Sequence, residues 1–473
     1  MPRTYLHTHY TRRVIFLAVS AAVGGFLFGF DSSVINGAVD SIGHHYALGS
    51  FTTGVVVAVA LLGCAVGALG AGWLSQRFGR LKVMMLGAFL FLVSSVGTGL
   101  ATNVIDMIVW RAVSGIGIGV ASVVAPAYIA EIAPRQLRGR LGSLQQLAIT
   151  LGIFGALLSD TLLAHVAGGS SQQLWLGLEA WRWMFLVGVI PSIVYGLLAF
   201  VLPESPRYLL TRGRRQEARQ IFAKFVPPTQ LEQTVNDITE AIEADRKNRH
   251  ASLRGSTFGL KPVVWIGIIL SIFQQFVGIN VIFYYSTTLW KSVGFDESQA
   301  LAVGVVSSLV NVAVTFIAIW LVDRLGRKII LLTGSLMMAA ALSVMALCFA
   351  FAQSVDGVVT LPTPYGPIAL VAANVFIVGF GASWGPLVWV LLGEIFPGHI
   401  RSKALGVAVA AQWIANFTVT VSFPVMSSWS LAGTYGMYAL VAALSFLFVL
   451  RKIPETKGVE LEQTEHLFVS NKP

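Results

Sequence analysis

Two charged residues lie inside apolar stretches that are long enough to cross a lipid bilayer. Asp31 lies in the run VIFLAVSAAVGGFLFGFDSSVINGA, and Arg111 lies near the start of WRAVSGIGIGVASVVAPAYIA. A charge at membrane depth costs about 2.5–3.5 kcal/mol on insertion scales, so such residues usually face a cavity or an opposite charge. The pair therefore indicates either proton or ion coupling, or a purely structural buried ion pair.

The elements that must position these charges are membrane helices. Of the 473 residues, 55% are hydrophobic and only 11% are charged, whereas a soluble domain carries about 25% charged residues. Apolar runs of roughly 20 residues recur along the whole chain, which predicts an all-α membrane protein with twelve transmembrane helices. The expected spans are 13–38, 51–75, 83–102, 105–130, 141–164, 182–202, 262–290, 298–322, 328–352, 366–393, 403–426 and 431–450.

The distribution of positive charge predicts the topology. The net charge is +10, but most Lys and Arg residues lie in short loops on alternate sides of the spans rather than in a basic groove for nucleic acid. Loops 39–50, 165–181, 353–365 and 427–430 contain no Lys or Arg and are expected outside. Both termini are then cytoplasmic, in a multi-pass protein of the plasma (inner) membrane.

A charged segment divides the spans into two sets of six. We expect an N-terminal bundle (1–202), a cytoplasmic helical linker (203–260), a C-terminal bundle (261–452) and a cytoplasmic tail (453–473). Within the linker, Leu231, Val235, Ile238 and Ile242 lie four, three and four residues apart, on one face of an amphipathic helix. One or two short helices are expected over 207–225. The alternative is a disordered charged linker.

The two halves repeat. GWLSQRFGRLK after the second span corresponds to WLVDRLGRK after the eighth, and AEIAPRQLRGR after the fourth corresponds to GEIFPGHIRSK after the tenth. Such repeats are typical of transporters built from two pseudo-symmetric bundles with a site near the midplane. The matched residues are Arg77 with Arg324, Arg80 with Arg327, Glu131 with Glu394, and Arg138 with Arg401.

The motifs identify the chain as a member of the sugar porter family of the major facilitator superfamily. It resembles this family in GGFLFGFD (24–31), the RFGR and DRLGRK loops, PESPRYL (203–209), QQFVGINVIFYYS (274–286), WGPLVWVLLGEIFP (384–397) and PETKG (454–458). The nearest likeness is to bacterial sugar:proton symporters, with the human glucose facilitators more distant. The motifs occur in the family's order across about residues 12–460.

The resemblance implies a proton-coupled importer of a monosaccharide, with Asp31 and Arg111 as the coupling pair. Facilitators of the family typically carry an amide at the position of Asp31, so this residue argues against the alternative of a passive hexose facilitator. A non-transporting sugar sensor usually has a long cytoplasmic tail, which this chain lacks. The chain shows no phosphate-binding loop and no histidine cluster, so we expect no enzyme activity, cofactor or metal, and we expect a monomer.

Amide side chains match the hydroxyl groups of a neutral sugar, because they donate and accept hydrogen bonds without adding charge. A single intramembrane amide more often bonds a neighbouring helix, but seven amides in both halves favour a common site. By resemblance, six residues align with sugar-contacting positions of the family: Gln146, Gln274, Gln275, Asn280, Asn311 and Trp389. Gln412, Trp413 and Asn416 are further candidates, with Phe28 and Tyr285 as a gate or lid.

Ile153 lies two helical turns after Gln146, where the bacterial xylose symporter has a polar glutamine and glucose transporters have an apolar residue. This position favours a hexose, most simply glucose, with xylose or inositol as alternatives. Gly278 and the Tyr284–Tyr285 pair predict a helix that can break and close over the sugar. Gly385 and Pro386 form a similar weak point.

The charged loop residues are expected to form a latch. Arg77, Arg80, Arg138, Arg324, Arg327 and Arg401 could bind helix C-termini or pair with Glu131 and Glu394, holding the bundles together at the cytoplasmic face while the outer side is open. The simpler alternative is control of topology by positive charge.

Overall fold

The computed structural model describes residues 2–133, 138–224, 226, 228–247, 252–255, 257–355, 358–396 and 400–455. Twelve of its helical segments are long and apolar enough to cross a membrane, and their limits agree with the predicted spans to within a few residues at most ends. The all-α membrane architecture is therefore confirmed.

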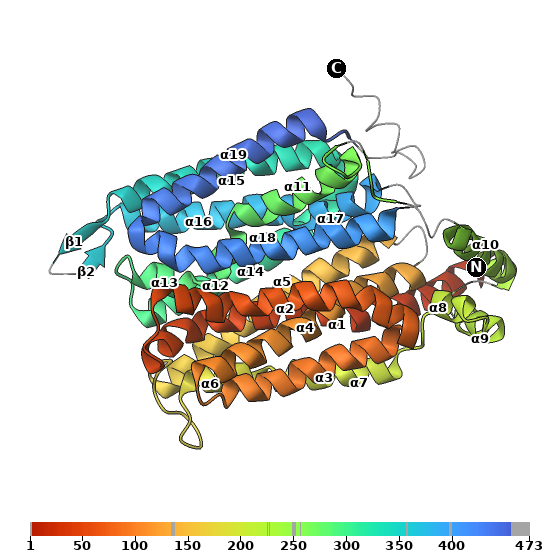
Figure 1. Cartoon of the computed structure of the whole chain (residues 1–473), viewed down its shortest axis with the longest axis horizontal. Coiled ribbons are helices and arrows are strands. Elements are labelled where there is room, and N and C mark those ends of the chain that lie inside the picture. The colour runs from red at the N-terminus through yellow and green to blue at the C-terminus, as the bar shows by residue number, and fades with distance from the viewer. Residues whose placement is uncertain are drawn as a thin grey trace.

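The first six spans form one bundle, drawn in red to yellow in the lower part of Figure 1. Its sixth span is divided at Gly188, a break that the sequence analysis missed. Pro191 explains it, because proline has no N–H to donate to the carbonyl of Val187 one turn earlier. The helices are α1 (Pro2–His45), α2 (Ser50–Phe78), α3 (Arg80–Gly99), α4 (Val104–Ile132), α5 (Arg138–Ala167), α6 (Ala180–Val187) and α7 (Val189–Val201).

Three shorter helices follow and lie together at one end of the molecule (Figure 1). They are α8 (Pro206–Thr211), α9 (Arg215–Phe222) and α10 (Pro228–Lys247). The amphipathic helix is confirmed: Leu231, Val235 and Ile242 are buried and Ile238 is half-buried on one face of α10. We call this end of the molecule the linker end.

The second bundle lies above the first in Figure 1 and repeats its plan. Its helices are α11 (Pro262–Phe276), α12 (Ile279–Tyr284), α13 (Ser286–Lys291), α14 (Glu297–Leu325), α15 (Arg327–Ala350), α16 (Tyr365–Gly381), α17 (Trp384–Ile395), α18 (Arg401–Trp429) and α19 (Leu431–Lys452). A short antiparallel pair, β1 (Gln353–Val355) with β2 (Val358–Thr360), projects from the opposite end to α8–α10. The sequence analysis expected only a loop there. We call this the hairpin end.

Two spans of the second bundle break where the sequence predicted weakness. Gly278 separates α11 from α12 with φ of +84°, a left-handed conformation that glycine adopts without strain. A Cβ atom at Gly278 would also lie 2.7 Å from the ring of Tyr438. The tenth span breaks at Ser383, immediately before Gly385 and Pro386. Both breaks lie at the centre of the molecule, so backbone carbonyls become available to side chains there.

Small residues allow the helices of the first bundle to approach closely. A Cβ atom at Gly115 would lie 1.9 Å from the carbonyl oxygen of Ala60, and one at Gly119 would lie 2.2 Å from that of Cys64. The small residues of α4 therefore allow it to pack closely against α2.

The two bundles are joined at the hairpin end. The Asn36 side chain donates to Thr287 Oγ1 at 3.0 Å and accepts from the Thr287 backbone N–H at 2.9 Å. One turn further along α1, Asp40 accepts from Thr288 at 2.7 Å and pairs with Lys291 at 2.8 Å. We call these contacts between α1 and α13 the hairpin-end seam. They close this end of the molecule.

Candidate functional site

All eleven residues predicted to contact substrate line one cavity between the bundles. Its empty volume, including space open to solvent, is about 680 Å³. α1 and α5 form one wall, while α11, α12, α14, α16, α17 and α18 form the other. The predicted residues that meet there are Phe28, Gln146, Ile153, Gln274, Gln275, Asn280, Asn311, Trp389, Gln412, Trp413 and Asn416.

Four amides of the second bundle form a continuous hydrogen-bonded chain. Asn280 donates to Gln275 at 2.6 Å, and Gln275 donates to Gln274 Oε1 at 3.3 Å. Gln412 also donates to Gln274 Oε1, at 2.7 Å. Gln274 Nε2 in turn donates to the carbonyl oxygens of Trp384 and Gly385, at 2.9 and 3.2 Å. The break in the tenth span therefore orients the whole chain of amides.

Two polar atoms of this wall have no hydrogen-bond partner among the described residues. They are Gln412 Oε1 and Trp413 Nε1, and both are buried. A buried polar atom without a partner costs about 1–3 kcal/mol, so native proteins rarely leave one unless a ligand or water completes it. The acceptor of Gln412 and the donor of Trp413 are therefore available to a hydroxyl group in the cavity.

Aromatic rings close the cavity between the bundles. Phe28 of α1 meets Trp413 of α18 edge to face, with ring centroids 5.2 Å apart. Trp389, Phe283 and Phe380 complete the apolar lining. The walls thus offer ring faces to a C–H surface and amides to hydroxyl groups.

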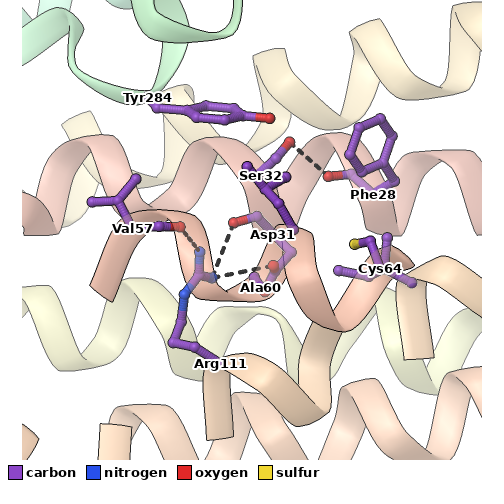
Figure 2. Close-up of a pocket in the computed structure, with 10 residues that line it drawn as sticks. Phe28, Asp31, Ser32, Val57, Ala60, Cys64, Arg111 and Tyr284 are labelled. Carbon is purple, nitrogen blue, oxygen red and sulfur yellow. Dashed lines mark hydrogen bonds and ion pairs between the residues drawn. The ribbon is translucent and has the colours of Figure 1, made fainter. Parts of the chain in front are cut away.

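The two charged residues singled out from the sequence form an ion pair deep in the first bundle (Figure 2). Arg111 Nη1 donates to Asp31 Oδ2 at 3.1 Å, and Ser114 donates to the same oxygen at 3.3 Å. Arg111 also donates to the carbonyl oxygens of Val57, at 3.3 Å, and of Asp31 itself, at 3.4 Å. Arg111 is 1% exposed and Asp31 6%, so both charges are withdrawn from solvent.

This ion pair adjoins the larger cavity. Asp31 and Arg111 line a second, smaller pocket with an empty volume of about 250 Å³. Phe28 and Ser32 line both spaces. Tyr284 of α12 lies across this pocket from the other bundle, near Ser32 in Figure 2. Its hydroxyl group is buried without a partner in the described part of the chain. Asp31 therefore shares a pocket with residues of both bundles, and two of these residues also line the larger cavity.

Tyr285 is placed differently from the prediction. Its hydroxyl group donates to the carbonyl oxygen of Thr420 at 3.0 Å, and its ring packs on Phe423. It lines neither of the two described spaces, because α12 ends there and the side chain turns towards α18. Tyr284, predicted as a gating residue, is the tyrosine that faces the ion-pair pocket.

The sequence analysis missed several lining residues. Ile149 lies three residues after Gln146 and four before Ile153, so helical spacing alone would have placed it in the cavity. Ser32, Ile279 and Phe283 follow predicted residues by one turn or less, whereas Phe380 carries no comparable signal.

At the linker end the predicted charges form two matching networks. Arg80 pairs with Glu131 at 2.7 Å, and Arg327 pairs with Glu394 at 3.0 Å. The PES and PET motifs complete them, because Glu204 accepts from the Arg80 backbone N–H at 3.0 Å and Glu455 accepts from that of Arg327 at 2.8 Å.

Each of these ion pairs lies inside one bundle rather than across the interface, in a structure whose hairpin end is closed. The predicted latch concerns the opposite state and stays a prediction. Arg77 lies over the ring of Trp73 and Arg324 over that of Trp320. The side chains of Arg138 and Arg401 lie outside the described residues.

Comparison with known proteins places the chain among membrane transporters. Residues 17–468 match the family profile described as "Sugar (and other) transporter". The chain is 50% identical over 452 residues to a glucose transport protein of Synechocystis, covering 95% of this chain and 96% of the relative. It is 37% identical over 497 residues to the D-xylose-proton symporter of Escherichia coli, covering 98% and 97%.

Solved structures of membrane transporters match the chain over nearly its whole length. A proton:xylose symporter of the major facilitator superfamily, bound to 6-bromo-6-deoxy-D-glucose, matches with a TM-score of 0.82 and 36% identity. The alignment covers 97% of this chain and 99% of that one. An inward-open structure of the E. coli xylose transporter matches with a TM-score of 0.80 and 35% identity, covering 96% and 100%.

Proposed function

The chain belongs to the family of sugar (and other) transporters, within the major facilitator superfamily, and is not an enzyme. From this premise we propose that it is a proton-coupled symporter. It imports a monosaccharide, glucose or a closely related hexose, by alternating access to the cavity between its bundles.

The chemistry of the cavity lining carries this proposal. Among the described lining side chains none is charged, and the polar ones are mostly amides. Such a lining suits a neutral ligand with many hydroxyl groups, since each hydroxyl group donates and accepts. A hydroxyl group of the ligand could also bond the unpartnered Oε1 of Gln412 and Nε1 of Trp413.

The ion pair supplies a mechanism for coupling. Protonation of Asp31 removes its charge and with it most of its attraction to Arg111, which keeps the carbonyl oxygen of Val57 as an acceptor. The tie between α1 and α4 is thereby loosened. α1 carries Phe28 and Ser32 at the cavity and Asn36 at the hairpin-end seam, all on one face. Proton binding therefore acts on the helix that contacts both the sugar and the closed end.

The arginine-rich loops support a cytoplasmic location for the linker end and both termini, in the plasma membrane. The hairpin end is then extracellular, so the closed seam separates the cavity from the outside. We propose a monomer, because the two bundles of one chain suffice to form the cavity.

The hexose preference rests on an apolar patch of the cavity. Ile149 and Ile153, one turn apart on α5, line it. A hexose would bury its hydroxymethyl carbon against such a patch, whereas a pentose would leave a gap. The 50% identity to a glucose transport protein, against 37% to xylose and galactose symporters, supports the same choice.

Uptake into proteoliposomes tests the proposal. Labelled glucose should accumulate above the external concentration when the lumen is made alkaline, and should only equilibrate when the proton gradient is dissipated. Unlabelled xylose, galactose, fructose and inositol are added as competitors. Equilibration regardless of the gradient would indicate a passive facilitator, and no flux at all would indicate a sensor. Stronger competition by xylose or inositol than by unlabelled glucose would overturn the hexose assignment alone.

A further inference from the structure

A second carboxyl group is buried in the membrane region, and the coupling mechanism above does not use it. Asp160 lies in α5 within the run ALLSDTLLAH, and its side chain is completely inaccessible to solvent. Oδ2 accepts one hydrogen bond, from the backbone N–H of Gly37 at 3.3 Å. Oδ1 has no hydrogen-bond partner among the described residues.

The fold brings Asp160 against bare backbone. A Cβ atom at Gly37 would lie 2.7 Å from the Asp160 Cβ and 2.9 Å from Oδ2, so only glycine permits this approach of α1 to α5. A carboxylate with one long hydrogen bond and no cation is poorly compensated in a dry interior, where a charge normally neutralises instead. This environment favours the neutral carboxylic acid over the carboxylate.

The charged groups on the elements around Asp160 are engaged elsewhere. Asp31 of α1 pairs with Arg111 of α4, and Asp40 of α1 pairs with Lys291 of α13. Arg182 of α6 bonds the carbonyl oxygens of Gly99 and Ala101, and Glu297 of α14 accepts from Ser170. On α5 itself His165 is exposed, and Glu394 of α17 pairs with Arg327 at the linker end. None of these groups has a described contact with Asp160, so no cation there compensates a carboxylate.

Asp160 lies on α5 between the sugar cavity and the hairpin end of the molecule. Gln146, Ile153 and Asp160 lie seven residues apart on one face of α5, so Asp160 is about 10 Å beyond Ile153 towards the hairpin end. Leu157, one turn before it, lies 3.8 Å from the position of a Cβ on Gly304 of α14 in the other bundle. Further along, Ser170 donates to Glu297 of α14. Asp160 thus lies between the cavity and the closed end, between two positions at which its segment contacts the other bundle.

We propose that Asp160 is a second proton-binding site, loaded when the hairpin end closes and unloaded to the same side when it opens. In the open state water reaches the carboxyl group, which ionises as an ordinary aspartate does. On closure the carboxylate takes a proton from the aqueous phase at the hairpin end and enters the interior as a neutral acid. The proton returns to its own side, so Asp160 makes closure depend on external pH without adding to the protons transported.

Infrared spectroscopy of the full chain in lipid vesicles tests the protonation state without any sugar, so it does not depend on the proposed function. A protonated carboxyl group gives a C=O stretching band that a carboxylate lacks. At neutral pH this band should lose intensity in Asp160→Asn. The spectrum of Asp31→Asn is recorded under the same conditions, so that the contribution of the Asp31 carboxyl group can be told apart from that of Asp160. Unchanged acid intensity together with loss of carboxylate absorption in Asp160→Asn would overturn the proposal.

A cysteine reporter tests the link to closure, which uses the alternating access of the proposed function. Leu157→Cys, in a chain whose Cys64 and Cys348 are replaced by Ala, should react with a membrane-impermeant thiol reagent only when the hairpin end opens, because Leu157 is 1% exposed. Rates are divided by those of Gln172→Cys, an exposed position in the loop after α5, to remove the intrinsic pH dependence of the thiol.

The relative labelling rate should rise with external pH, by at most about tenfold per unit for one proton. Adding Asp160→Asn should abolish that rise, because an amide cannot ionise. A rise that persists with Asn at this position would assign the pH dependence to another group and refute the role of Asp160 in closure. Neither the infrared measurement nor the labelling measurement needs sugar. A result that refutes the role of Asp160 can therefore be distinguished from a failure of sugar uptake in the transport assay.

Discussion

Replacing Asp31 by Asn should convert the protein into a passive carrier. Asn keeps the shape of the side chain and one acceptor for Arg111, whose bonds to the carbonyl oxygens of Val57 and residue 31 do not need the carboxylate. The substitution therefore removes the charge through which we propose that proton entry is coupled to transport, and it leaves the cavity lining intact. Sugar binding and sugar exchange across the membrane should persist.

The size of the effect follows from one proton per cycle. Asp160 returns its proton to the side from which it came, so Asp31 alone carries charge across. A gradient of one pH unit supplies about 1.36 kcal/mol per proton, which supports at most a tenfold accumulation of a neutral sugar. The wild-type protein should approach this ratio in proteoliposomes with an alkaline lumen, and Asp31→Asn should stay at a ratio of one.

Asp106→Asn is the matched control. It makes the same chemical change in a residue of the first turn of α4 that lines neither pocket, where Asp106 accepts a hydrogen bond from the backbone N–H of Thr102. Accumulation by this variant should resemble that of the wild type. If Asp31→Asn concentrates labelled sugar above the external level under the same gradient, the coupling role of Asp31 is refuted.

Three further outcomes are expected. Gln275→Ala and Asn280→Ala should each weaken sugar binding in titration calorimetry by about 1–3 kcal/mol. Asn374→Ala, in α16 and outside the cavity lining, should leave binding unchanged. Equal loss of binding in all three variants would indicate general damage to the fold. Ile153→Gln should shift competition for labelled glucose uptake towards xylose by a factor of about 10–200, and no shift would remove this residue from selectivity. Gly115→Val should lower the melting temperature in detergent through overpacking of about 1–3 kcal/mol against Ala60, and an unchanged melting curve would contradict the close α2–α4 contact.

Sequence reasoning was strongest where one physical requirement dominates. Crossing a bilayer demands a long apolar helix, so all twelve spans were predictable from composition along the chain. The break at Gly278 was predictable because glycine and adjacent polar residues weaken a helix. The lining amides were predictable because a polar group inside a membrane span must serve some purpose.

Tertiary geometry decided the rest. Tyr284 and Tyr285 are neighbours in sequence, and only the end of α12 decides which of them faces the ion pair. The pairing of Arg80 with Glu131 depends on the crossing of α3 and α4, which the repeat does not specify. Asp160 gave the same signal as Asp31, a charge in an apolar run, and was not singled out. Its lack of a cationic partner became visible only in the folded structure.

α1 and α5 behave as one unit in this architecture, and this joins the two proton sites to the sugar. A Cβ atom at Gly29 would lie 1.9 Å from the carbonyl oxygen of Ile149, and one at Gly152 would lie 2.2 Å from that of Phe26. Such close backbone packing resists sliding, so we expect α1 and α5 to move together. In the proposed mechanism, a proton on Asp31 loosens α1 from α4, and the movement that follows displaces Gln146 and Ile153 in the cavity together with Asp160 near the seam. That mechanism needs no separate element to transmit protonation to the substrate, because one helix pair carries both proposed proton sites and one wall of the cavity.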